Sequence, residues 1–101
     1  VLVVNVFSAF GAGDDVQSAG EKGVIKIIAF DAPTRIVAVL KSGLIDLVIA
    51  QHRAEMGYYG VVSAIAALRG HSVPAKIGTG FTVMTKDNIG DPKVSQYIYS
   101  E

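Results

Sequence analysis

Hydrophobic residues of this chain gather into short continuous runs, separated by stretches in which they recur at helical spacing. The runs are rich in β-branched side chains and have the length of buried strands. They predict strands at VLVV (1–4), VIKIIAF (24–30), LIDLVIA (44–50) and IGTGFTVMT (77–85).

The intervening stretches predict three helices, each followed by a glycine that suits a helix end. The first runs from about Ala9 to Ala19, the second from Pro33 to Gly43, and the third from Glu55 to Arg69. In the third, the spacing places five apolar residues on one face: Tyr58, Val61, Val62, Ile65 and Leu68. The tail KDNIGDPKVSQYIYSE is rich in turn residues and ends in an amphipathic or extended piece.

Regular alternation of strand and helix predicts the α/β class, with a parallel sheet built from βαβ units. Because helical crossovers between parallel strands are right-handed, we expect all strands to point the same way. The carboxyl ends of the strands then meet at one edge of the sheet, where open α/β sheets bind their ligands.

Polar side chains stand at the ends of three successive predicted strands. Asn5 follows VLVV, Asp31 follows VIKIIAF, and Gln51 follows LIDLVIA. One carboxylate and two carboxamides offer paired donors and acceptors, which suits the vicinal hydroxyls of a neutral polyol. No lysine or arginine accompanies the three, so the pattern favours a sugar over a phosphate.

Each residue also has a purely structural interpretation. Asp31 suits the N-cap of the helix that begins near Pro33, and Asn5 and Gln51 suit loop residues that bond nearby backbone groups. Phe7 and Phe10, near the same edge, suit either the core or stacking on a sugar ring. The occurrence of all three polar residues at one edge favours a binding site.

Composition excludes several functions. The 101 residues carry nine basic and nine acidic side chains without a basic stripe, which argues against nucleic acid as a partner. Cysteine is absent, and the two histidines, His52 and His71, have no metal-ligand spacing. No nucleophile stands near a base, so we expect neither a metal, a cofactor nor catalysis.

Targeting patterns are sparse. The opening VLVVNVFSAFGA lacks a positive leader, and no apolar run reaches the ~20 residues of a membrane-spanning helix. The chain starts inside a hydrophobic strand without a methionine. We therefore expect a soluble C-terminal piece of a longer protein.

A family resemblance rests on several segments taken together. An Asn at a strand end precedes AFGAG, and IIAFDAP, IDLVIAQHRAEMGYYGV, LRGHSVP and IGTGFTVMTKDNIGDP follow. In this combination the chain resembles the C-terminal third of sugar-binding proteins of ABC transporters, the periplasmic binding proteins of the ribose-binding type. It departs at Val6, where the family commonly has Asp, and at Arg53, where Pro is usual.

The resemblance implies a partial periplasmic-binding-protein fold, with Rossmann-like lobes around a cleft. It assigns residues 1–50 and 84–101 to the C-terminal lobe and 54–83 to the N-terminal lobe, with a hinge at 51–53. It further implies that Asn5, Asp31 and Gln51 hydrogen-bond sugar hydroxyls, and that closure of the lobes signals to a permease. The implied location is periplasmic or extracytoplasmic, including tethering to a membrane as a lipoprotein.

Two other functions share this pattern of elements. A sugar-responsive regulator of the lactose-repressor type has the same fold, although TVMTKDNIGDP and the ending YIYSE resemble the transport proteins more. A Rossmann-like nucleotide-dependent enzyme would use GAG at 11–13, but Val16 occupies the third glycine position. Because several strands are apolar on both faces, we also expect the isolated chain to self-associate.

Overall fold

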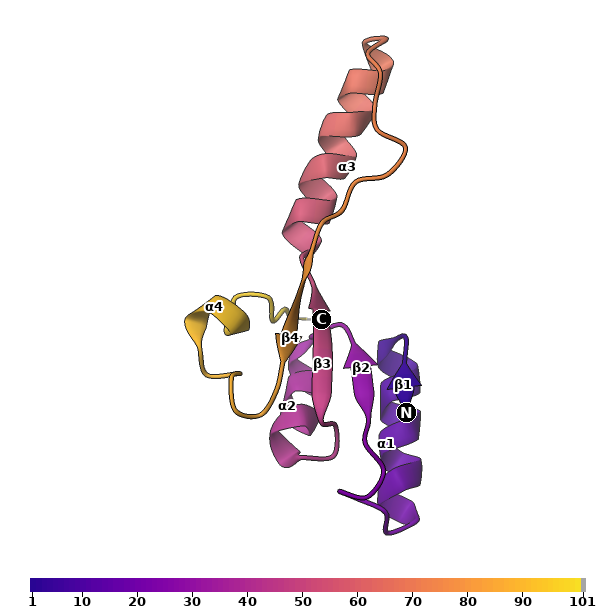
Figure 1. Cartoon of the computed structure of the whole chain (residues 1–101), viewed down its shortest axis with the longest axis vertical. Helices are drawn as coiled ribbons and strands as arrows, with labels where there is room; N and C mark the ends of the chain where they lie inside the picture. Colours follow the sequence, from indigo (N-terminus) through magenta and orange to yellow (C-terminus); the bar gives the residue numbers. More distant parts are fainter. Residues whose placement is uncertain (101) are drawn as a thin grey trace.

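A computed structural model describes residues 1–100, in which four strands and four helices alternate along the chain (Figure 1). In chain order they are β1 (Leu2–Val3), α1 (Val6–Ser18), β2 (Ile28–Phe30), α2 (Thr34–Ser42), β3 (Leu47–Gln51), α3 (Arg53–Leu68), β4 (Phe81–Met84) and α4 (Pro92–Ser95). The predicted α/β class is confirmed. The strands are shorter than the apolar runs that predicted them.

The sheet has the order β1-β2-β3-β4, and its first three strands are parallel as predicted. Leu2 pairs with Ile28 and Ala29 with Val48. Helices α1 and α2 make the crossovers between these strands. The two βαβ units therefore bring the carboxyl ends of β1, β2 and β3 to one edge.

The direction of the fourth strand was predicted wrongly. β4 is antiparallel to β3, with Val48 opposite Met84 and Gln51 opposite Phe81. A parallel strand needs a crossover helix that packs back onto the sheet, but no residue of α3 is buried. Helix α3 instead runs away from the sheet, and the chain returns beside it into β4 (Figure 1).

A single hydrophobic core lies between the sheet and the helices α1 and α2. Its largest fully buried side chains are Ile27, Ile36, Leu40, Ile45, Val48 and Met84. Helix α1 turns Ala9, Gly13 and Val16 toward this core. Helix α2 ends as the sequence indicates, since Gly43 closes it with φ 79°.

Residues 53–80 form an arm that projects from this body (Figure 1). The molecule measures 57 × 26 × 20 Å, and its radius of gyration is 16.6 Å. A compact domain of 100 residues has a radius of gyration of about 13 Å. The apolar face predicted for the third helix therefore lies in the open, with Tyr58, Val61, Val62, Ile65 and Leu68 all exposed.

Candidate functional site

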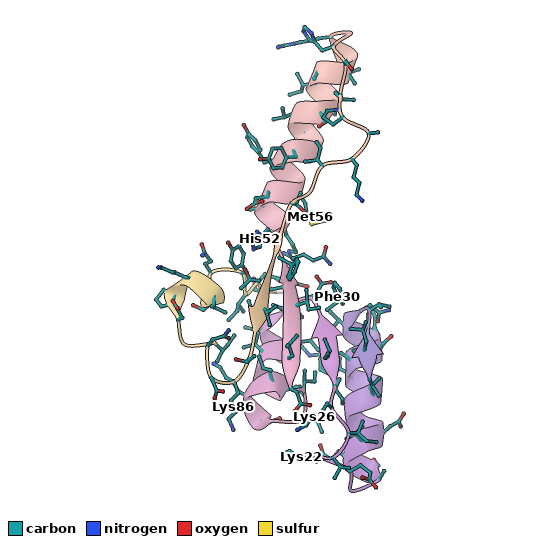
Figure 2. All side chains as sticks on the ribbon, in the orientation of Figure 1. Lys22, Lys26, Phe30, His52, Met56 and Lys86 are labelled. Carbon is teal, nitrogen blue, oxygen red and sulfur yellow. The ribbon has the colours of Figure 1, made fainter. Side chains whose placement is uncertain are left out.

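The three polar residues predicted at strand ends lie along the carboxyl edge of the parallel strands. Asn5 lies two residues beyond β1, Asp31 follows β2 directly, and Gln51 is the last residue of β3. These strands are consecutive neighbours in the sheet. The arm leaves from the same edge, because α3 begins two residues after Gln51. Phe30 marks the end of β2 on the side that faces the arm (Figure 2).

Asp31 and Gln51 are joined directly. The Gln51 Nε2 donates a hydrogen bond to Asp31 Oδ1 at 3.2 Å, and both residues are half-buried. The backbone N–H of Asp31 also donates to the carbonyl of Ile49 at 3.0 Å. A carboxylate has about four acceptor positions, so one bond from Gln51 leaves Asp31 able to accept from ligand hydroxyls.

Asp31 has an unusual backbone conformation. Its φ is 69°, and it is the one non-glycine residue with positive φ among those described. Such a conformation costs about 1–3 kcal/mol unless the residue is glycine, and it persists where the surrounding structure enforces it. The N-cap interpretation is wrong, because Pro33 occupies the N-cap of α2 and no side chain caps that helix. Capping of α2 therefore does not account for the unusual conformation of Asp31.

Asn5 bonds a nearby backbone group, as its structural interpretation predicted. It is the N-cap of α1, and its Oδ1 accepts a hydrogen bond from the Ser8 N–H at 2.9 Å. This cap explains why α1 begins at Val6 rather than at the predicted Ala9. The carboxamide nitrogen still carries two donors on an exposed side chain. Asn5 can therefore cap its helix and donate to a ligand together.

An aromatic pocket of about 290 Å³ borders the edge, lined by Val6, Phe7, Phe10, Pro33, Arg35 and Tyr99. Phe7 is 88% exposed and does not belong to the core. Phe10 packs partly against the core, and the Arg35 guanidinium lies 4.6 Å from its ring centroid. Tyr99 lines the same pocket. Its backbone carbonyl accepts a hydrogen bond from the Thr34 N–H at 3.0 Å, which holds the C-terminal segment beside the start of α2.

A smaller pocket of about 180 Å³ has Gln51 and Arg53 on one side and residues 96–99 on the other. The Arg53 guanidinium lies 3.2 Å from the centroid of the Tyr99 ring. We expected no arginine beside the three polar residues, but in the folded chain Arg53 lines the same pocket as Gln51. Both Arg35 and Arg53 stack on aromatic rings, an arrangement that the planar guanidinium group favours.

Sequence reasoning also missed a cluster around His52. Its Nε2 lies 2.8 Å from Thr82 Oγ1, and its Nδ1 lies 3.3 Å from a carboxylate oxygen of Glu55. Its ring stacks on Tyr97, with centroids 4.1 Å apart and planes 9° apart. Only the i,i+3 spacing of His52 and Glu55 was visible in the sequence, since the other partners lie at least 30 residues away.

Two further properties concern residues 1–100 only. Within this range no group of three or more His, Cys, Asp or Glu side chains is arranged to hold a metal ion. Within the same range, none of the helices combines the length and apolar character that a membrane crossing needs.

The fold and the edge define a class of protein: an α/β sheet with uncharged and acidic hydrogen-bonding groups at the carboxyl ends of its strands, the usual place for a small ligand. Comparison with known proteins makes this class more specific. No protein-family model and no curated protein matches the chain.

Solved structures match it along its length. An ABC transporter solute-binding protein from Agrobacterium vitis, crystallised with α-D-tagatopyranose, is 57% identical, with a TM-score of 0.87 over 100% of this chain and 35% of that one. A second from the same species, with bound D-fucose, is 30% identical, with a TM-score of 0.82 over 97% of this chain and 34% of that one. A carbohydrate transporter solute-binding protein from Agrobacterium radiobacter, in complex with D-arabinose, is 33% identical, with a TM-score of 0.83 over 98% and 34%.

The resemblance to sugar-binding proteins of ABC transporters is therefore confirmed, and so is the partial fold of that family. The chain spans about a third of the length of these structures. All three relatives are solute-binding proteins rather than enzymes.

Proposed function

We propose that this chain is part of the substrate-binding component of an ABC transporter, and that it helps to capture a neutral sugar in a cleft between two lobes. The observation that carries the proposal is the bonded pair of Asp31 and Gln51 at the edge of the parallel strands, with Asp31 held at φ 69°. Strain of this kind concentrates at ligand sites.

The chemistry of the edge suits a sugar. The Asp31 carboxylate accepts from two vicinal hydroxyls, while Gln51 fixes its orientation and Asn5 donates from its carboxamide nitrogen. The exposed ring of Phe7 offers an apolar face to the C–H groups of a pyranose, with the wall of the aromatic pocket beside it. The three relatives were crystallised with a ketohexose, a deoxyhexose and a pentose, all of them uncharged.

The arm supports the division into lobes. Residues 1–50 and 84–101 would belong to one lobe and residues 54–83 to the other, with 51–53 as a hinge. The arm stands apart from the body and leaves from the edge that bears the three polar residues (Figure 1). Closure of the lobes on the sugar would then be the event that the permease reads.

Partner and location follow from this role. The permease of the transporter would be the protein partner, and the setting would be periplasmic or extracytoplasmic, with or without a lipid tether. The protein would bind its sugar without changing it chemically. A regulator of the lactose-repressor type would use the same fold, but the three relatives described are transport proteins. A nucleotide enzyme is disfavoured, because Gly11 and Gly13 lie inside α1 rather than in a strand-to-helix turn.

Titration calorimetry on the full-length protein tests the proposal, with D-tagatose, D-fucose and D-arabinose as probes. We expect micromolar or tighter binding of at least one sugar, and loss of that binding in Asp31→Ala. Asp14→Ala, an exposed aspartate of α1, is the matched control and should bind as the wild type does. Undiminished affinity in Asp31→Ala, or no binding of any sugar by the wild type, would contradict the proposal.

A further inference from the structure

The arm is joined to the body by two chain passages, which we call the neck: residues 51–53, leading out, and residues 80–82, leading back. His52 lies in the first passage, where Figure 2 shows it at the junction of arm and body. Its side chain is 16% exposed. A largely buried imidazole at the narrowest part of the molecule is well placed to control how the arm is held.

The two ring nitrogens of His52 connect different elements. Nδ1 faces the Glu55 carboxylate of α3 at 3.3 Å, and Nε2 faces the Thr82 hydroxyl of β4 at 2.8 Å. A hydroxyl can donate or accept, so Thr82 can bond Nε2 in either tautomer of the neutral ring. In the imidazolium form Nε2 donates and the hydroxyl accepts. The contact between His52 and Thr82 can therefore form in either protonation state.

The faces of the ring are occupied as well. Tyr97, from the segment after α4, stacks on one face with centroids 4.1 Å apart. Gly80 lies against the ring with φ 74°, where an added Cβ would lie 3.1 Å from Nδ1. The charged groups nearby are Glu55 and the neighbouring Arg53, whose guanidinium lies over Tyr99. His52 thus contacts the start of the arm, its return and the C-terminal segment.

We propose that His52 is a positioning residue that latches the arm to the body in the arrangement that binds sugar. This inference rests on the proposed function. Body and arm together match a tagatose-bound relative, with a TM-score of 0.87 over the whole chain. The neck is therefore seen here in an arrangement compatible with a bound sugar. Loss of the latch would lower the population of this arrangement, and the apparent affinity would fall by the same fraction.

The test uses the full-length protein and D-tagatose, the sugar bound in that relative. His52→Phe keeps a flat ring against Tyr97 but removes both nitrogen contacts, and Thr82→Val removes the hydroxyl at almost constant volume. We expect each variant to weaken tagatose binding about five- to tenfold, the loss expected for one hydrogen bond. The double variant should lose little more than His52→Phe alone, because both substitutions break the contact between His52 and Thr82.

The other histidine of the chain supplies the control. His71→Phe, at the exposed end of the arm, should bind tagatose normally. Tagatose should also shift the NMR signals of the His52 ring and leave those of His71 in place, which a residue that only stabilises the fold would not show. Wild-type binding that is unchanged in His52→Phe and Thr82→Val would overturn the latch and leave the proposed function standing.

Failure of the proposed function gives a different result. If the wild type binds none of the three sugars, amide hydrogen exchange at residues 50–53 and 81–84 still decides about the latch. Exchange there should be about tenfold faster in His52→Phe than in His71→Phe. Equal exchange in the two variants would show that His52 does not hold the neck.

Discussion

Gln51 donates from its side-chain nitrogen to the carboxylate of Asp31 across 3.2 Å, so the ends of two neighbouring parallel strands are tied by their side chains as well as by the sheet. The bond also restricts the rotamers of both side chains. A preorganised pair loses less conformational entropy on binding than two free side chains do. The remaining polar groups of the edge are then presented in one arrangement.

Replacing Asp31 by glycine should separate stability from binding. Glycine adopts φ 69° freely, so Asp31→Gly relieves strain that costs about 1–3 kcal/mol, while its extra unfolded-state entropy costs about 0.5–1 kcal/mol. We expect the free energy of unfolding to stay constant or rise by about 1 kcal/mol, with sugar binding lost. Denaturant unfolding and calorimetry on the same variant check both parts. A clear loss of stability would show that the aspartate side chain supports the fold.

Asn5 should show two separable roles. Asn5→Ala removes the oxygen that caps α1, and loss of such a cap costs about 1 kcal/mol of stability. Asn5→Asp keeps the capping oxygen but removes the two amide donors, so stability should stay near the wild-type value while sugar affinity falls. Thermal unfolding and calorimetry of both variants provide the measurement. Equal sugar affinity in wild type and Asn5→Asp would limit Asn5 to the cap.

Asp46 should stabilise the fold mainly by its hydrogen bond to a backbone N–H, and less by its ion pair with Lys26. Its Oδ2 accepts from the Ile27 N–H at 2.9 Å, and its Oδ1 lies 3.2 Å from the Lys26 ammonium, which is mostly exposed. Asp46→Ala leaves the Ile27 N–H without its partner, at a cost of about 1–3 kcal/mol. Lys26→Ala should cost less than about 1 kcal/mol, as exposed pairs do. Denaturant unfolding of the two variants should rank them in that order, and the reverse order would contradict this account.

The exposed arm should make the isolated 101-residue chain self-associate. Val61, Val62, Ile65 and Leu68 leave an apolar stripe on α3 that nothing in residues 1–100 covers. We expect a dimer in light scattering, and a monomer after Val62→Lys combined with Ile65→Lys. Val24→Lys, at a body residue that is 73% exposed, is the comparison and should leave the association in place. A wild-type chain that stays monomeric at high concentration would refute the prediction.

Much of the fold was predictable because strand and helix periodicity reports local burial. The three parallel strands and the helices between them appear where the pattern places them. Hydrophobic spacing alone did not predict the direction of β4, because the apolar face of residues 55–69 has the same spacing as a helix that packs on its own sheet. Hydrophobic spacing indicates that one face of a helix is apolar, but it does not identify the element that packs against that face.

The candidate site was also only partly predictable from the sequence. The position of Asn5, Asp31 and Gln51 at one edge was predictable, because it depends only on where three strands end. The strained φ of Asp31 has no signature in the residue type, since aspartate is common in ordinary turns. Tyr97 and Tyr99 approach the edge only because the C-terminal segment folds back across it. Contacts between residues so distant in sequence depend on the whole topology.

The arm is also a lever. Because the neck joins the arm to the body at one end of α3, a change of a few degrees in the backbone angles of residues 51–53 is amplified along the length of α3 into a large displacement of its tip (Figure 1). Distances within the neck hardly change in such a swing. A pair of spectroscopic labels, one on the tip at Arg69 and one on α2 at Lys41, would therefore report small rotations that the sheet edge itself conceals.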